Sequence, residues 1–109
     1  MNTIIIPPVT SHNLDAHSGF PFIPHMAGYL AGELKKYDDN LQIIDGFSED
    51  PTNITIKGDF MFQGLTILDI ASRIKQNTKN IFIYARTIID YEVIIEIVRY
   101  LSKFKKYNI

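Results

Sequence analysis

This chain contains no cysteine and no long apolar run, and neither positive nor negative charge predominates in it. The lack of cysteine excludes disulfides, zinc–thiolate sites and iron–sulfur clusters held by these 109 residues. A net charge of -1 provides no broad field for nucleic acid or an acidic membrane surface. No apolar run approaches the ~20 residues of a membrane-spanning helix, and the start lacks the pattern of a secretory signal. We therefore expect a cytoplasmic chain with neither nucleic acid nor membrane as partner.

What remains is the composition of one small globular domain. Hydrophobic residues make up 46% and charged residues 21% of the chain, which is close to ordinary soluble usage. The length also lies near the common size of a single domain. A packed core is therefore expected.

Three short apolar segments predict strands at residues 3–6, 41–45 and 80–85. The first is a continuous β-branched run, which is typical of a strand buried on both faces of a parallel sheet. Pro7 and Pro8 are expected to end it, because proline has no amide hydrogen to donate to a neighbouring strand. A long polar loop is expected over residues 9–22, and loops of that length are often functional.

A helix is predicted after each strand. Pro24 suits the first turn of the first helix, whose expected apolar stripe includes Met26 and continues to residue 34. Thr66 is predicted to cap the second helix, with Asp69 three residues later. Asp90 or Thr87 is expected to cap the third, whose apolar face is predicted to consist of Ile94, Ile97, Val98, Leu101 and Phe104.

Right-handed connections between these strand–helix units define the expected fold. It is an α/β, three-layer Rossmann-like half domain, with a parallel sheet of about three strands in the order 2-1-3 and helices on both faces. Sheets of this type usually have about five or six strands, so residues 1–109 are expected to form a single truncated domain. The loops after the three strands should meet at one edge, where such sheets bind ligands.

Two stretches of sequence carry a family resemblance. The first is Pro7-Pro8 followed by Ile-Pro-His-Met-Ala-Gly-Tyr-Leu-Ala-Gly-Glu-Leu at residues 23–34 and a strand ending in Asp45. The second is Gly-Leu-Thr-Ile-Leu-Asp-Ile-Ala at residues 64–71. Together they resemble the N-terminal cobalamin-binding-type domain of cobalamin-dependent radical S-adenosylmethionine enzymes. In addition, Asp15, His17 and Gly19 resemble the Asp-x-His-x-x-Gly motif of histidine-ligating cobalamin domains, with one residue fewer before the glycine.

The resemblance implies cobalamin as cofactor and a radical domain as possible partner, with no iron–sulfur cluster in this chain. It also implies that the chain is not catalytic on its own but serves as an accessory domain of such an enzyme system. His17 is the expected ligand of cobalt, with Asp15 holding its ring. The expected cofactor-binding residues are Pro8, Ser11, Asp15, His17, Ser18, Gly19, Asp45, Arg86 and Thr87.

Each of these side chains also has a simpler interpretation. His17 suits a solvated loop, and Asp45 followed by Gly46 suits a turn. Arg86 and Thr87 suit either a phosphate at a helix N-terminus or an exposed strand end. The apolar residues 60–62 suit a lid over the cofactor, a docking surface or ordinary packing.

The alternative function is a small non-catalytic interaction or regulatory protein that uses the half domain as a dimerising scaffold. An acid–base enzyme using His17 and Asp15 is a third hypothesis, without a second catalytic group to support it. The third strand would lie at a sheet edge without charge or proline to protect it. We therefore expect a homodimer, or a protein partner that supplies the missing strands, with Phe82 or Tyr84 near the interface.

Overall fold

The computed structural model describes residues 1–11, 25–86, 88–104 and 106–109. Its central feature is a parallel sheet of three strands, β1 (Asn2–Ile6), β3 (Gln42–Asp45) and β6 (Asn80–Ile83), arranged in the order β3-β1-β6. The register places Ile4 opposite Ile43 on one side and Phe82 on the other. The prediction of an α/β chain with a three-stranded parallel sheet is therefore confirmed.

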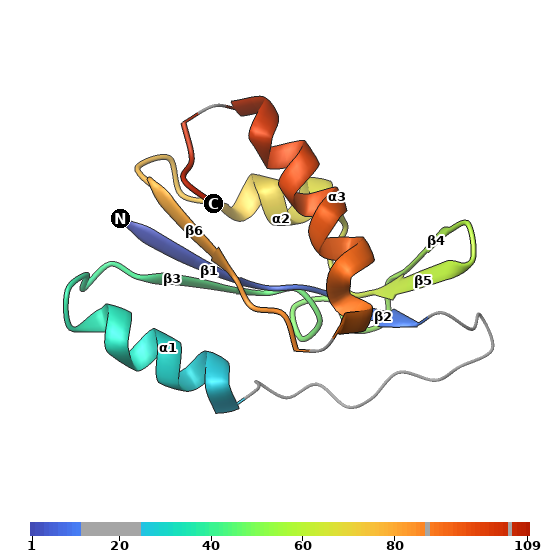
Figure 1. Ribbon diagram of the computed structural model, residues 1–109, viewed down its shortest axis with the longest axis horizontal. Helices are drawn as coiled ribbons and strands as arrows, with labels where there is room; N and C mark the ends of the chain where they lie inside the picture. The colour runs from blue at the N-terminus through green and yellow to red at the C-terminus, as the bar shows by residue number, and fades with distance from the viewer. Residues whose placement is uncertain (12–24, 87, 105) are drawn as a thin grey trace.

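The helices lie on both sides of this sheet (Figure 1). Helix α1 (His25–Lys35) lies on one side, and α2 (Ile67–Arg73) and α3 (Tyr91–Leu101) lie on the other. In α1 only Ala27 is buried, and Met26 is 62% exposed. The prediction that Met26 belongs to the buried stripe is wrong, because successive residues of a helix are turned by about 100° from one another.

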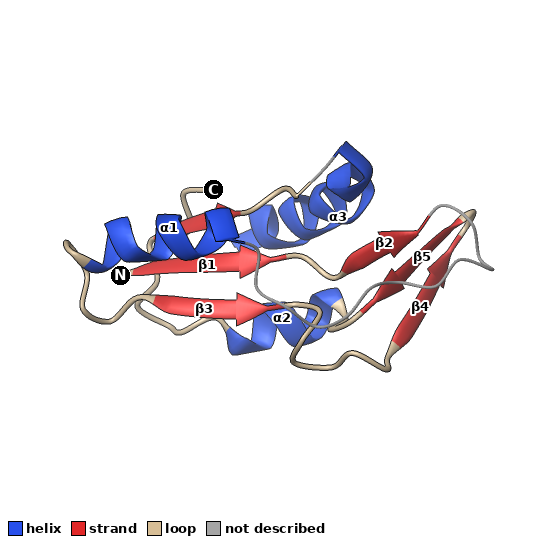
Figure 2. Ribbon diagram, turned by 90° about the horizontal axis from the view of Figure 1, so that it is seen from below, coloured by secondary structure: helices blue, strands red, loops and turns tan. Residues whose placement is uncertain are grey.

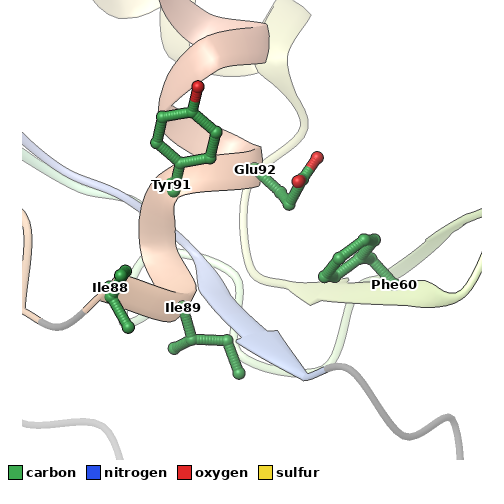
Figure 3. Close-up of a pocket in the computed structure, with 5 residues that line it drawn as sticks. All are labelled: Phe60, Ile88, Ile89, Tyr91 and Glu92. Carbon is green, nitrogen blue, oxygen red and sulfur yellow. The ribbon is translucent and has the colours of Figure 1, made fainter.

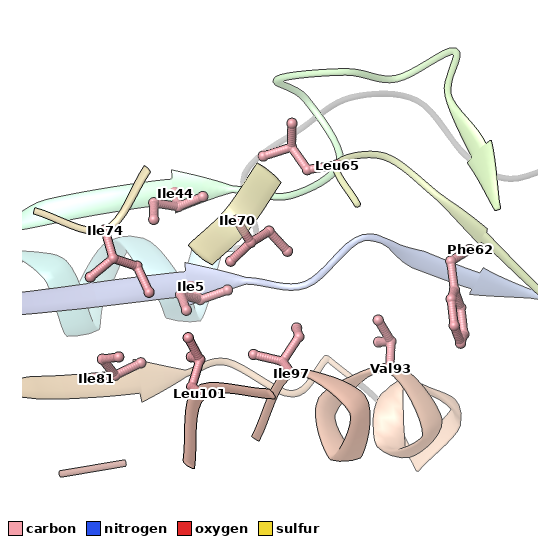
Figure 4. Close-up of a cluster of buried hydrophobic side chains, with 10 residues drawn as sticks. All are labelled: Ile5, Ile44, Phe62, Leu65, Ile70, Ile74, Ile81, Val93, Ile97 and Leu101. Carbon is pink, nitrogen blue, oxygen red and sulfur yellow. The ribbon is translucent and has the colours of Figure 1, made fainter. Parts of the chain in front are cut away.

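The hydrophobic core lies between the sheet and the pair α2 and α3 (Figure 4). β1 and α3 contribute side chains that are almost fully buried, among them Ile5, Val93 and Ile97. The predicted face of α3 is partly wrong, since Val93 is buried and Phe104 is 47% exposed. The core cluster consists of Ile5, Ile44, Phe62, Leu65, Ile70, Ile74, Ile81, Val93, Ile97 and Leu101.

The predicted cap of α2 is present. Thr66 Oγ1 accepts a hydrogen bond from the backbone N of Asp69 at 3.1 Å. This bond satisfies one of the amide groups that a helix start leaves without a partner. The predicted cap of α3 is different: Asp90 stands at the capping position but makes no side-chain cap bond, because Arg86 engages its carboxylate.

A second sheet, which the sequence did not predict, lies beyond the carboxyl ends of the parallel strands (Figure 2). Its antiparallel strands β2 (Val9–Ser11), β4 (Ile54–Lys57) and β5 (Phe60–Gln63) have the order β2-β5-β4. The predicted loop over residues 9–22 is therefore wrong at its start. Pro7 and Pro8 lead the chain from one sheet into the other, where β5 provides a new hydrogen-bonding partner.

The chain returns to the outer side of β6 after α3 and the short helix η2 (Ser102–Phe104). Asn108 forms an isolated parallel bridge with Asn80, and its carbonyl accepts the amide hydrogen of Ile81 at 2.7 Å. Side-chain amides join Asn2, Asn80 and Asn108 into a ladder, with bonds of 3.0 and 3.1 Å. The amino end of the β6 edge is thus covered. Among the described residues, no helix has the length and apolar character needed to cross a bilayer.

Candidate functional site: the carboxyl edge of the parallel sheet

The expected site lies at the carboxyl ends of β1, β3 and β6. Of the predicted site residues, Pro8, Ser11, Asp45 and Arg86 are described. Asp15, His17, Ser18, Gly19 and Thr87 lie outside the described residues, so the expected cobalt ligand and its support stay predictions.

Asp45 shapes the turn that follows β3. Its Oδ1 accepts the backbone amide hydrogens of Phe47 at 3.1 Å and Ser48 at 3.0 Å. Its own backbone N donates to Glu49 Oε2 at 2.6 Å, and Glu49 Oε1 lies 3.2 Å from Arg73 Nε of α2. These bonds are those of an aspartate turn, the simpler of the two interpretations. The residue is only 8% exposed, and its Oδ2 has no hydrogen-bond partner.

Backbone segments approach one another closely behind Asp45. The amide of Gly46 donates to the carbonyl of Ile6 at 2.7 Å, and Leu65 N donates to the carbonyl of Gly46 at 2.6 Å. A Cβ atom added to Gly46 would lie 2.6 Å from the oxygen of Ile6 and 2.8 Å from the nitrogen of Pro8. Such distances leave no room for a side chain, so this part of the edge is closed by protein backbone.

Arg86 is held inside the protein. Its Nη2 donates to the carbonyl oxygens of Pro7 and Pro8, each at 2.9 Å, and its Nε lies 3.2 Å from Asp90 Oδ2. The Asp90 side chain is 3% exposed and the Arg86 side chain 22%. The guanidinium therefore fastens the link between the two sheets to the start of α3, and few of its donors remain for a ligand.

Pro8 and Ser11 lie on the segment that Arg86 fastens. Pro8 is fully buried, and its ring packs against the turn at Gly46. Ser11 is 9% exposed and pairs with Met61 across the second sheet. Thr10, the residue before it, has a buried hydroxyl without a hydrogen-bond partner. The structure thus brings Pro8 next to both Arg86 and the turn that Asp45 forms, while the Asp45 side chain is bonded within that turn.

An apolar hollow of about 540 Å³ lies between the start of β5 and the start of α3. Figure 3 shows its lining residues: Phe60 from β5, Ile88 and Ile89 from η1 (Ile88–Asp90), and Tyr91 and Glu92 from α3. Ile88 is 92% exposed and Tyr91 60%. Of this lining, Phe60 belonged to a segment singled out from the sequence, residues 60–62. The adjacent residues Ile88 and Ile89 before a helix were the sequence signal that could have identified the other lining residues.

The chemical capacity of this edge is limited. Among the described residues that line the hollow, Glu92 is the single carboxylate, and none is a histidine, a serine or a second acid. Asp45 is engaged in a turn and Arg86 in an ion pair. In the described part of the chain, no group of three or more potential metal ligands is present. The described residues show no pair of groups arranged for acid–base or nucleophilic catalysis.

Neither a protein-family model nor a curated protein matches this chain, and no solved structure matches its fold.

Proposed function

We propose that this chain is a non-catalytic, Rossmann-like interaction module that binds another polypeptide along the outer side of β6. In this proposal the module is a half domain of the doubly wound type, with its partner supplying further strands. The proposal keeps the cytoplasmic location expected from the sequence.

The observation that carries the proposal is that, among the described residues, nothing pairs with the outer side of β6 beyond the Asn108 bridge. Tyr84 N donates inward to Ile5 O at 2.9 Å, while Ile81 N donates outward to Asn108 O. Because backbone groups alternate in direction along a strand, the N–H and C=O groups of Ile83 point outward, beyond the end of the Asn108 bridge. Phe82 beside them is 37% exposed. Free backbone groups next to apolar side chains favour addition of a strand.

The Asn108 bridge also favours one direction for the partner. The chain at Asn108 runs parallel to β6 at Asn80. The carbonyl oxygen of Asn108 already accepts the amide hydrogen of Ile81. A partner strand placed beyond Asn108 and pointing in the same direction would run parallel to β6 and reach Ile83. A partner that supplies parallel strands therefore fits the edge better than one that must displace Asn108.

Site-specific photo-crosslinking tests this proposal. A benzophenone amino acid at position 82 should form a discrete adduct with a second polypeptide in the cells that make the protein. The same group at position 29 should not, since Tyr29 is 71% exposed but lies on helix α1, which offers no open strand. If position 82 gives no more adduct than position 29, the β6 edge is not a binding surface.

A cobalamin-binding-type accessory domain of a radical S-adenosylmethionine enzyme system is the second candidate. One observation favours it: Asp45 keeps a buried oxygen without a partner at a strand end, where sheets of this type contact ligands. The other described residues do not form an open cradle, since Pro8 is buried and Arg86 is engaged. The radical domain would belong to a partner.

Titration with hydroxocobalamin tests this second candidate. The isolated chain should bind weakly or not at all, with a dissociation constant above the order of 1 μM, which corresponds to about −8 kcal/mol. If binding occurs, His17→Ala should abolish the spectrum of a histidine-ligated cobalt. An unchanged spectrum in that variant would exclude His17 as the ligand, and tight binding would contradict the expected incomplete pocket.

A further inference from the structure

Strand β4 forms the outer edge of the second sheet and is open to solvent. It pairs with β5 on one side, and among the described residues no strand pairs with its other side (Figure 2). All its residues are exposed, including Ile54 at 53% and Ile56 at 64%. Two isoleucines are therefore presented to water on a strand whose position in the sheet leaves one side unpaired.

The hydrogen bonds to β5 identify which backbone groups are free. Gly64 N donates to the carbonyl of Asn53 at 2.9 Å, so the carbonyl of Asn53 points toward β5. Because this direction alternates along a strand, Thr55 does the same. Ile54 and Ile56 direct their N–H and C=O groups outward, and within the described part of the chain no strand pairs with that side.

The sequence of this edge is self-complementary. Ile54-Thr55-Ile56 reads the same in both directions. When two copies are placed antiparallel about a two-fold axis with Thr55 opposite Thr55, each Ile54 faces Ile56 of the second copy. These are the residues whose backbone groups point outward, so both pairs can exchange N–H···O bonds. Of the possible registers, this one matches open donors with open acceptors and apolar side chains with apolar side chains.

The charge next to this edge does not oppose such pairing. Lysine on an edge strand usually discourages association. Here the ammonium of Lys57 lies 2.6 Å from Glu96 Oε2 of α3, which offsets its charge within the same copy. In the paired register, Lys57 lies opposite the uncharged Asn53 of the second copy, so no like charges face each other.

We infer that two copies of this chain join through β4, forming one continuous antiparallel sheet in the order β2-β5-β4-β4-β5-β2. Each Ile54 packs beside Ile56 of the other copy on one face of this sheet, and the two Thr55 hydroxyls meet on the opposite face. The interface leaves β6 free. It is therefore independent of the strand partner proposed above, and either proposal can fail without the other.

A cysteine substitution tests both the interface and its register. Directly opposed residues of a pair that is not hydrogen-bonded have Cα atoms about 4.5 Å apart, within the range that a disulfide requires. The chain has no other cysteine. Thr55→Cys should therefore form a covalent dimer on mild oxidation. Ser72→Cys, at an exposed position of α2, should remain monomeric under the same conditions. If the two variants crosslink equally, or if Thr55→Cys does not crosslink, the proposed register is wrong.

Sedimentation equilibrium tests the same interface without a covalent bond. Wild-type chain, with a monomer mass of 12.5 kDa, should sediment as a dimer at micromolar concentration. Ile56→Lys should weaken the dimer at least tenfold, because it places a charge among the isoleucines. Ile43→Lys replaces another exposed isoleucine, on β3 at 45% exposure, and should leave the dimer intact. A monomeric wild type, or a dimer that Ile43→Lys disrupts and Ile56→Lys does not, would overturn the inference.

Discussion

Arg86 and Asp90, four residues apart in the sequence, form an ion pair, and the same guanidinium binds the carbonyl oxygens of Pro7 and Pro8. The start of α3 is thereby fastened to the link between the two sheets. Since Asp90 is almost completely buried, its carboxylate depends on Arg86 for compensation.

Removal of this arginine should be strongly destabilising. Arg86→Met should lower the free energy of unfolding by about 3 kcal/mol or more, because a buried carboxylate loses its partner. Urea denaturation measures the effect. Lys36→Met is the matched control: Lys36 pairs with Glu33 at 2.9 Å, but both side chains are about two-thirds exposed, so a loss below about 1 kcal/mol is expected. Similar losses in the two variants would contradict the structural role of Arg86.

The close approach at Gly64 should tolerate no side chain. Gly64 has φ +132°, and an added Cβ would lie 2.0 Å from the oxygen of Gly46. Gly64→Ala should therefore cost roughly 3 kcal/mol or more, from backbone strain and displaced neighbours. By contrast, Gly28→Ala lies in α1 with no atom within 4 Å and should stabilise the protein by about 0.5–1 kcal/mol. Thermal unfolding of both variants compares the two effects.

The cap of α2 provides a smaller, well-defined effect. Thr66→Ala removes the oxygen that accepts the amide hydrogen of Asp69 and should cost about 1 kcal/mol. Thr66→Ser keeps the hydroxyl and should retain most of the stability. Equal destabilisation by serine and alanine in denaturant titrations would show that the methyl group matters more than the cap.

Hydrogen exchange can test the unequal protection of the β6 edge. The amide of Ile81 is bound by Asn108 and should exchange at least about tenfold more slowly than that of Ile83 in chain without a strand partner. Asn108→Pro removes the bond from Asn108 N to the carbonyl of Lys79. In this variant Ile81 should lose its protection, while Tyr84, bound to β1, should keep it. Protection of Ile83 equal to that of Tyr84 would mean that the edge is already covered.

The parallel sheet and the cap of α2 could be predicted because their signals are local. A continuous apolar run marks β1, and Thr66 with Asp69 marks the helix start. The turn at Asp45 also agrees with the simpler interpretation of an aspartate before a glycine. Such patterns depend on neighbours in the sequence and need no knowledge of distant residues.

The second sheet was missed because its partner strands are distant in sequence. Proline at positions 7 and 8 was interpreted as the end of a strand, since the pairing of Thr10 with Phe62 has no local signature. A signal for the hairpin was present: β4 and β5 are separated by Gly58 and Asp59, a two-residue connection of the kind that favours tight hairpins. The pairing of residues 54–57 with residues 60–63 was not predicted.

The role of Arg86 was missed for the same reason. Its partners are a buried aspartate four residues later and two carbonyl groups near residue 8. The sequence shows an arginine at a strand end, which fits an exposed side chain or an anion site equally well. The covering of β6 by Asn108 likewise depends on where the chain returns after α3.

The central place of β1 has a consequence for the order of events during synthesis. β1 is translated before both of its neighbours in the sheet, β3 and β6. The edge of β1 that faces β6 must therefore stay unpaired until Asn80, which comes 78 residues after Asn2, has been translated. Such distant pairings close slowly and leave apolar segments open to aggregation in the meantime. Conditions that slow translation late in the chain should therefore reduce the yield of folded protein.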